Sequence, residues 1–182
     1  MYTTFIDLVR SRRSVRKYLK KDIPLSDYQR CIEAAIISPS ACNSQPWKFI
    51  IINDIATRNL IAKTVFTGPY KMNAFAAKAA GYIAIVSEKI KFSAMLAGII
   101  RNTDFTKIDI GIACSHLSLQ AQALNIGTCI LGWFNEKKLK KILSVPRTKR
   151  IELLLSLGYP EKTDFPKKIM KDPNETYSCN KY

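Results

Sequence analysis

One stretch between a helical pattern and a strand pattern constrains the fold more than any other. It reads Pro39-Ser40-Ala41-Cys42-Asn43-Ser44-Gln45-Pro46-Trp47, and the apolar run Phe49–Ile52 follows it. Each proline fixes its own φ and disfavours the helical region for the residue before it, so the stretch is held extended. Its hydroxyl and amide groups offer donors and acceptors in a compact space. We expect a loop that binds a polar, flat, heteroaromatic ligand; an ordinary surface loop is the alternative.

The pattern around this loop alternates between helices and strands. Apolar and β-branched runs predict four strands, and helical spacing with capping residues predicts the helices between them. The strands are expected at 47–52, 81–86, 128–133 and 151–157. One helix is expected to begin near Phe5, and a second to run from a Ser26-x-x-Gln29 capping box to about Ser38. Two more are expected after Asp54 and after Asn135, and the longest helix spans 109–124. With no repeat or linker, residues 1–182 are expected to form a single α+β domain.

The segment 109–124 carries an apolar stripe that runs from Ile110 to Leu124 at helical spacing. Its opposite side is also rather apolar, so we expect this helix to be buried on most faces. Asn125 and Gly127 provide its C-terminal stop. The last twenty or so residues are polar and contain spaced prolines, which indicates an arm lying on another surface.

Cysteine and histidine usage excludes several classes of site. The five cysteines are widely spread without a C-x-x-C, and His116 is the only histidine. This pattern argues against a disulfide framework and against a zinc site, so no metal ligands are expected. The longest apolar run, 79–86, is too short to cross a bilayer, and the first residues do not resemble a signal peptide. We therefore expect a cytoplasmic protein that does not associate with membranes.

The charge is strongly basic, with 29 Lys and Arg against 14 Asp and Glu and a net charge of +15. Seven basic residues and no acidic residue lie between Arg10 and Lys21, and Lys162, Lys167 and Lys168 follow the last strand. Such groups could converge on one phosphate, although two solvated charge runs are the simpler interpretation. A third group, 137–150, is interpreted as surface charge. Nucleic-acid binding is not expected, because neither interleaved aromatics nor a reading helix is evident.

The chain contains no obvious catalytic set of its own. It has no G-x-S-x-G, no Walker loop and no G-x-G-x-x-G after a strand. His116 lies mid-helix near the apolar stripe, and is interpreted as a residue at the edge of the core. An enzyme built in this way would take its chemistry from a cofactor.

Five motifs together resemble the FMN-dependent nitroreductase family, and the resemblance covers nearly the whole chain. They are Arg12-Arg13-Ser14-Val15-Arg16, Ser38–Trp47, Asp109-Ile110-Gly111-Ile112-Ala113, Gly127–Trp133 and Leu157-Gly158-Tyr159-Pro160. The first two are fairly specific in combination, and the others are weak alone. The resemblance implies a mixed, mostly antiparallel central sheet flanked by helices, and a homodimer in which the C-terminal arm reaches the partner subunit.

The resemblance also implies two FMN sites at the subunit interface, each built from both chains. Arg12 and Ser14 match positions that hold the phosphate and ribityl chain, Arg13 lies beside them through its backbone, and Arg16 matches the basic residue near the N1–C2 edge of the ring. The remaining implied cofactor-binding residues are Pro39, Ser40, Ala41, Asn43 and Gln45 from the loop lent by the partner, Ile130, Leu131 and Gly132 from the strand end facing flavin N5, and Lys167 and Lys168 near the phosphate. No side chain is implied to be catalytic in its own right.

Two departures from the family pattern concern the substrate. Relatives often carry an acidic residue at the position of Leu131, and the span from Glu88 to Lys107 is short where longer relatives insert helices over the flavin. A second basic residue near the ring could be Lys71 or Lys78. The resemblance thus implies an FMN enzyme that takes hydride from NADH or NADPH and reduces a nitroaromatic, a quinone or a similar flat acceptor. Alternatives are a flavin-binding or sensing protein with little turnover, a specialised flavin dehydrogenase, or a basic nucleic-acid-binding domain.

Overall fold

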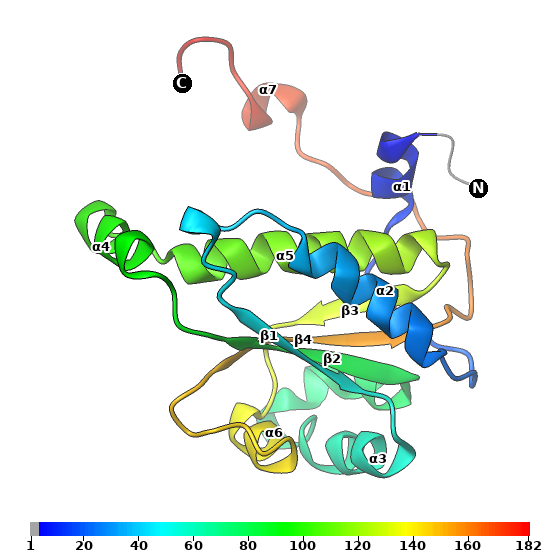
Figure 1. Cartoon of the computed structure of the whole chain (residues 1–182). Coiled ribbons are helices and arrows are strands. Elements are labelled where there is room, and N and C mark those ends of the chain that lie inside the picture. The colour runs from blue at the N-terminus through cyan, green and yellow to red at the C-terminus, as the bar shows by residue number, and fades with distance from the viewer. Residues whose placement is uncertain (1–3) are drawn as a thin grey trace.

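The computed structural model describes residues 4–182, which form one sheet with helices on both sides (Figure 1). The strands are β1 (Trp47–Ile52), β2 (Gly81–Ser87), β3 (Gly127–Leu131) and β4 (Ile151–Gly158). The helices are α1 (Phe5–Ser11), α2 (Leu25–Ile36), α3 (Ile55–Thr64), α4 (Phe92–Arg101), α5 (Phe105–Ala123), α6 (Glu136–Ile142) and α7 (Pro173–Thr176), with 3-10 helices η1 (Ala41–Asn43) and η2 (Gly68–Lys78).

The sheet has the order β1-β2-β4-β3, and all three neighbouring strand pairs are antiparallel. A single parallel bridge joins Ser14 to Thr128 at the β3 edge. The predicted α+β class with a mostly antiparallel sheet is confirmed, and all four strands lie where the sequence places them to within two residues.

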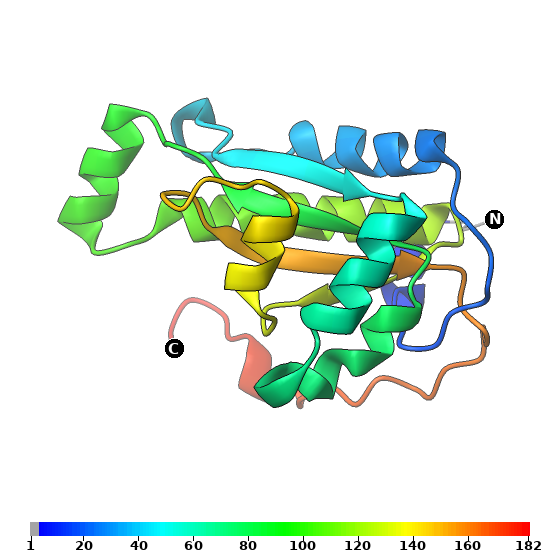
Figure 2. The same ribbon diagram turned by 90° about the horizontal axis from the view of Figure 1, so that it is seen from below.

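Helices cover both faces of this sheet (Figure 2). Successive side chains of a strand point to opposite faces, so Ile83 and Ile85 meet α2 and α5, whereas Tyr82 and Ala84 meet α3, η2 and α6. The apolar strand β2 is buried on both faces for this reason. The sheet therefore separates two cores of similar composition.

The segment after α1 lies against the open edge of the sheet. The Val15 amide donates to the Thr128 carbonyl at 2.9 Å, and the Leu19 amide donates to the Tyr159 carbonyl at 2.8 Å. A Cβ atom added to Gly127 would come within 2.5 Å of Val15 Cγ2, so only glycine permits this close approach. The basic run is thereby held beside the end of β4 and along β3.

Local signals predict some helix boundaries correctly and others wrongly. Asp54 accepts from the Thr57 amide at 2.8 Å and Asn135 from the Lys138 amide at 3.0 Å, so both predicted N-caps are confirmed. The predicted capping box at Ser26 is wrong, because α2 starts at Leu25 and its N-cap, Pro24, forms no side-chain cap. α5 starts at Phe105 rather than 109, after the N-cap Asp104.

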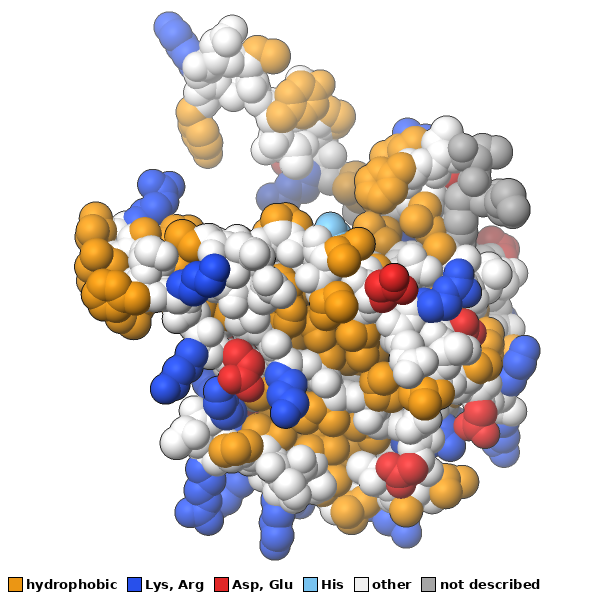
Figure 3. Space-filling view, viewed as in Figure 1, with side chains coloured by type: hydrophobic (Ala, Val, Ile, Leu, Met, Phe, Trp, Pro, Cys, Tyr) orange, Lys and Arg blue, Asp and Glu red, His pale blue; other side chains and the backbone are white. Residues whose placement is uncertain are grey.

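Two exposed surfaces differ from expectation. α4 was not predicted, and its large apolar side chains Phe92, Ile99 and Ile100 are 71%, 68% and 80% exposed, which gives the orange projection in Figure 3. α5 is buried on one face only, because Ile108 is 49% exposed and Gly111 is exposed. The prediction that this helix is buried on most faces is therefore wrong for a single chain.

The C-terminal segment beyond Lys168 is exposed and leads away past α1 (Figure 1). No helix of residues 4–182 is long and apolar enough to span a membrane.

Candidate functional site

Basic side chains from the two ends of the chain meet beside α1. Arg12 caps the C-terminus of α1, and Lys168 Nζ donates to the Val9 carbonyl of the same helix at 3.2 Å. Burial lowers the pKa of Lys168, and the nearby charges of Arg13 and Arg12 lower it further. The structure thus brings Lys168 to the arginines, although 159 residues separate it from Val9. Lys167 is exposed.

Arg13 is anchored but incompletely paired. Its Nη1 donates to the carbonyls of Arg10 and Arg12, while Nε is buried and has no hydrogen-bond partner within residues 4–182. A buried N–H without an acceptor is costly, and none of the six ion pairs of the described chain involves Arg12, Arg13 or Lys168. An unpaired donor among three cations fits a phosphate group, because phosphate oxygens accept charge-assisted hydrogen bonds.

Arg16 lies further along the same edge, toward η2. Its guanidinium carbon sits 5.7 Å from the centre of the Phe75 ring, and its Nη1 donates to the Ser14 carbonyl at 3.3 Å. Burial raises the pKa of the Cys129 thiol in β3, and the charges of Arg16 and Arg12 oppose this rise, which places both guanidinium groups near the strand. Phe75 was missed by sequence reasoning, because the segment after Ala74 has too weak a pattern to assign.

The end of β3 is tied to η2 by a set of contacts around Trp133. The indole N–H of Trp133 donates to the Pro69 carbonyl at 3.1 Å, and its ring lies 5.3 Å from that of Tyr70. The Asn73 side-chain amide donates to the Trp133 carbonyl at 2.7 Å. These residues form a fixed, partly aromatic wall next to Gly132. In the sequence, the only signal for this wall is that aromatic residues occur in both segments.

The three strand-end residues predicted to face a flavin differ in exposure. Ile130 is 42% exposed, Leu131 is buried, and Gly132 is exposed with no atom within 4 Å of an added Cβ. With its side chain directed into the core, Leu131 can contact a ligand only through its backbone.

The loop before β1 is polar, as predicted, but the prediction that it is extended is wrong. Ala41–Asn43 forms the 3-10 helix η1, in which the Asn43 and Ser44 amides donate to the Ser40 and Ala41 carbonyls at 2.9 and 3.0 Å. The prolines restrict only themselves and the residues directly before them, so the residues between them remain free to form turns. Cys42, Asn43 and Gln45 all adopt positive φ, between 48° and 52°. Such a backbone is uncommon outside glycine and persists only where neighbouring bonds hold it. Here the Gln45 amide donates to Ser40 Oγ at 3.0 Å, and the Gln45 side-chain amide donates to Asn43 Oδ1 at 2.9 Å. Pro39 and Asn43 are exposed.

A buried carboxylate of α5 anchors this loop. Both oxygens of Asp109 accept from the Ala41 amide, each at 3.1 Å. Asp109 is only 3% exposed, and its burial raises its pKa, opposed by the Ala41 hydrogen bond. The motif Asp109–Ala113 thus contributes an anchor for the loop before β1, a role that the sequence did not reveal.

The structure does not bring the loop and the basic cluster together within one chain. The loop is fastened at Asp109, whereas Ser11 and Arg13 line a hollow of about 500 Å³ with Gln122 and Asn125 at the other end of α5 (Figure 1). The 13 residues from Asp109 to Gln122 span about 20 Å at 1.5 Å per residue.

The other candidates remain apart from this arrangement. Lys71 and Lys78 are exposed on η2, and His116 is half-buried on α5. All five cysteines are free thiols. Within residues 4–182, no three His, Cys, Asp or Glu side chains form a group that could hold a metal ion.

Comparison with known proteins identifies the family. The nitroreductase family model matches residues 9–159. A "putative NADH dehydrogenase/NAD(P)H nitroreductase" of Archaeoglobus fulgidus is 29% identical over 165 residues, covering 88% of each chain, and an iodotyrosine deiodinase of Thermotoga neapolitana is 22% identical, covering 88% of this chain and 92% of its own. The structure of an FMN-dependent nitroreductase from Clostridium difficile R20291 superposes with a TM-score of 0.76 at 24% identity, covering 98% of this chain and all of that one. The chain therefore belongs to the nitroreductase family and is an oxidoreductase with that family's fold.

Proposed function

We propose that this protein is an FMN-dependent NAD(P)H oxidoreductase that reduces flat acceptors such as nitroaromatics or quinones. The observation that carries the proposal is the meeting of Arg12, Arg13 and Lys168 around an unpartnered buried N–H, in the segment that contacts the start of β3. A single phosphate group fits this cluster, and no dinucleotide motif accompanies it, which favours FMN over FAD. The similarity to the FMN-dependent nitroreductase from Clostridium difficile supports the same cofactor.

Each part of the site has a proposed role. Arg12, Arg13 and Lys168 bind the phosphate, with Ser14 beside the ribityl chain, and Arg16 holds a positive charge at the edge of the ring. The backbone of Leu131 and Gly132 faces the other ring edge, next to the wall formed by Trp133. When bound, the flavin supplies hydride acceptance and donation, and the protein contributes orientation and a fixed charge.

The site is proposed to be completed by a second subunit. Ser40 and Asn43 belong to the loop that Asp109 anchors, whereas Arg13 lines a hollow with Gln122, 13 positions further along α5, so Ser40 and Asn43 are proposed to serve the partner's site. The exposed side of α5 and the C-terminal arm are the surfaces proposed to join the two copies. The arm needs such a surface, because beyond Lys168 it is exposed throughout.

The decisive experiment is to identify the cofactor and then to measure turnover. The purified protein should be yellow, and heat should release FMN that chromatography separates from FAD. NADH or NADPH should then be oxidised in the presence of 4-nitrobenzoate or menadione. Release of FAD, or of no flavin, overturns the cofactor assignment.

The same experiment separates the proposed enzyme from its alternatives. A protein that holds FMN but is not reduced by either nicotinamide is a flavin-binding or sensing protein. Because one relative is named an iodotyrosine deiodinase, 3-iodotyrosine belongs in the acceptor panel. If 3-iodotyrosine is the only acceptor that is reduced, the proposal that nitroaromatics or quinones are the acceptors is overturned.

A further inference from the structure

A second basic surface lies around α6, outside the candidate flavin site. Lys and Arg side chains project from the lower left of the molecule in Figure 3, the region that α6 occupies in Figure 1. Between α6 and the turn that follows it is a hollow of about 910 Å³, lined chiefly by Lys137, Lys140, Lys141, Val145, Pro146 and Arg147. None of these residues belongs to the site described above.

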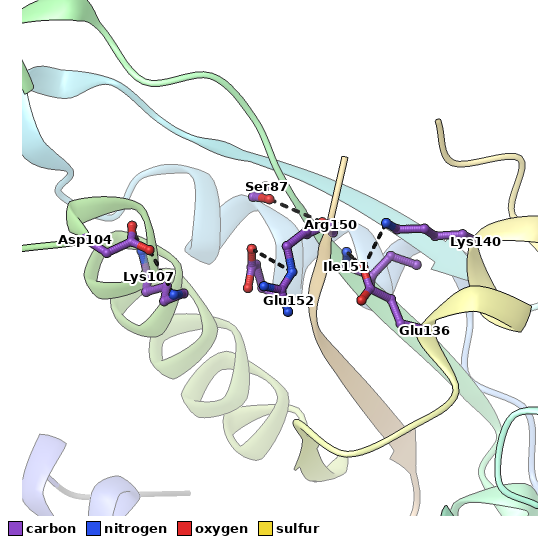
Figure 4. A network of polar contacts seen from close by, with 8 residues as sticks. All are labelled: Ser87, Asp104, Lys107, Glu136, Lys140, Arg150, Ile151 and Glu152. Atoms are coloured by element: carbon purple, nitrogen blue, oxygen red, sulfur yellow. Dashed lines mark hydrogen bonds and ion pairs between the residues drawn. The ribbon is translucent and has the colours of Figure 1, made fainter. Parts of the chain in front are cut away.

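The one carboxylate that lines this hollow is already occupied. Glu136 Oε1 forms an ion pair with Lys140 Nζ at 3.1 Å and accepts from the Ile151 amide at 3.0 Å (Figure 4). These contacts fasten α6 to the start of β4 and neutralise Lys140. Lys137, Lys141 and Arg147 form none of the six ion pairs present in residues 4–182. The hollow therefore retains three uncompensated positive charges.

The positions of these charges do not follow from helix stability. Cations in the last turn of a helix are favoured by the helix dipole, which accounts for Lys141. Lys137 lies in the first turn, where the dipole disfavours it, and it is spaced i,i+4 from Lys141, where like charges destabilise a helix. Arg147 comes from the turn beyond the helix and lines the same hollow. A bound anion would offset this repulsion.

We propose that the α6 hollow binds a small molecule carrying two or more linked phosphates. A volume of about 910 Å³ is at the upper end of ordinary small-molecule pockets and far exceeds one phosphate group. Three unpaired cations match the charge of linked phosphates, and the apolar surface of Val145 and Pro146 offers contact to an attached organic group. The concave shape favours such a ligand over a flat membrane surface. This site is independent of the flavin assignment.

The test uses the protein as purified, with inorganic triphosphate as the probe, titrated calorimetrically at physiological ionic strength. One molecule should bind per chain and raise the melting temperature. Lys137→Gln/Lys141→Gln/Arg147→Gln should lose at least about tenfold in affinity and the thermal shift. Without triphosphate this variant should be at least as stable as the wild type, because its like-charge pair is removed.

A charge-matched control separates a site from general basicity. Lys20→Gln/Lys48→Gln/Lys89→Gln removes the same number of charges from exposed lysines elsewhere and should keep the affinity within about threefold. Equal losses in both triple variants would overturn the proposal, as would the absence of binding to the wild type. Tighter binding of an oligothymidylate than of triphosphate, lost in the α6 variant, would also overturn it in favour of a nucleic-acid surface.

Discussion

At the scale of single residues, burial decides what each charged group can do. Arg13 keeps a buried donor without an acceptor, whereas the buried carboxylate of Asp109 shares one backbone donor between its two oxygens. The first arrangement attracts an anion. The second holds a loop in place and makes its stability depend on pH.

The ionisation of Asp109 should make the free energy of unfolding fall as the pH rises. Its folded-state pKa is raised above the ordinary 3.8, so the folded chain binds the proton more tightly than the unfolded chain, and stability falls between 3.8 and the raised value. Asp109→Asn keeps an acceptor for the Ala41 amide and should remove this fall. Urea unfolding across the acid range measures the difference between variant and wild type.

The matched variant Asp109→Ala removes the acceptor as well as the charge. Leaving the Ala41 amide without a partner should cost about 1–3 kcal/mol at every pH, and should increase hydrogen exchange in the loop 40–45. If Asp109→Asn shows the same pH slope as the wild type, the carboxylate is not the group responsible.

Arg16 should raise the flavin's midpoint potential, if the proposed cofactor is right. Reduction places negative charge on the ring edge, and loss of one fixed charge partner typically costs about 2–4 kcal/mol. Because roughly 30 mV corresponds to 1.4 kcal/mol for two electrons, Arg16→Ala should lower the midpoint by several tens of millivolts while FMN remains bound. Lys17→Ala, an exposed neighbour, is the control. An unchanged midpoint potential in Arg16→Ala would show that Arg16 is not the residue beside the flavin ring.

At the scale of elements, the contact between the 12–16 segment and β3 positions the candidate phosphate site. It depends on Gly127, whose missing side chain lets Val15 approach the strand. The basic residues before and after Val15 are thereby held at the sheet edge.

The helix boundaries at this scale show where local signals fail. α4 begins without a side-chain cap at Lys91, and its exposed side chains include the large apolar residues Phe92, Ile99 and Ile100.

Gly127→Ala should disturb this contact. The added Cβ would lie 2.5 Å from Val15 Cγ2, and such overpacking typically costs about 1–3 kcal/mol. FMN affinity should fall together with stability, because Arg12 and Ser14 move with the segment. Chemical denaturation and flavin titration measure the two effects.

A second substitution tests whether the cause is this clash. Val15→Ala removes the two methyl carbons at 2.5 and 3.0 Å from the new Cβ and leaves Val15 Cβ at 2.8 Å. The clash is thereby reduced, so the double variant should be less destabilised than the sum of the two single variants. Strict additivity would locate the damage elsewhere in the strand.

At the scale of the whole molecule, the two halves of the candidate site lie at opposite ends of α5. The outer side of that helix carries the half-exposed Ile108, and the C-terminal arm makes few contacts beyond Lys168. A twofold dimer would bury such surfaces and join one chain's loop to the other's phosphate cluster.

Ile108→Glu should therefore yield a monomer that has lost FMN. A charge buried at an interface without a partner is strongly disfavoured, and sedimentation with absorbance detection reports mass and flavin together. Ile55→Glu is the matched control, because Ile55 is 67% exposed on α3, across the sheet, and should remain a flavin-loaded dimer. An FMN-loaded Ile108→Glu monomer would show that one chain suffices.

Local chemistry in the sequence determined most of the elements. The four strands and the N-caps Asp54 and Asn135 follow from residue types at short spacing, because propensity and capping act over a few residues. The family motifs also named the Arg12–Arg16 segment, whose cofactor contacts stay predictions.

Only the tertiary structure decided which distant side chains meet. It placed Lys168 beside the α1 arginines, Phe75 beneath Arg16, and Asp109 against the Ala41 amide. These contacts join residues between 59 and 159 positions apart, and no periodicity or capping rule reaches that far. They form because the sheet order and the packing of α5 bring the segments together, and burial then sets the charge state of each group.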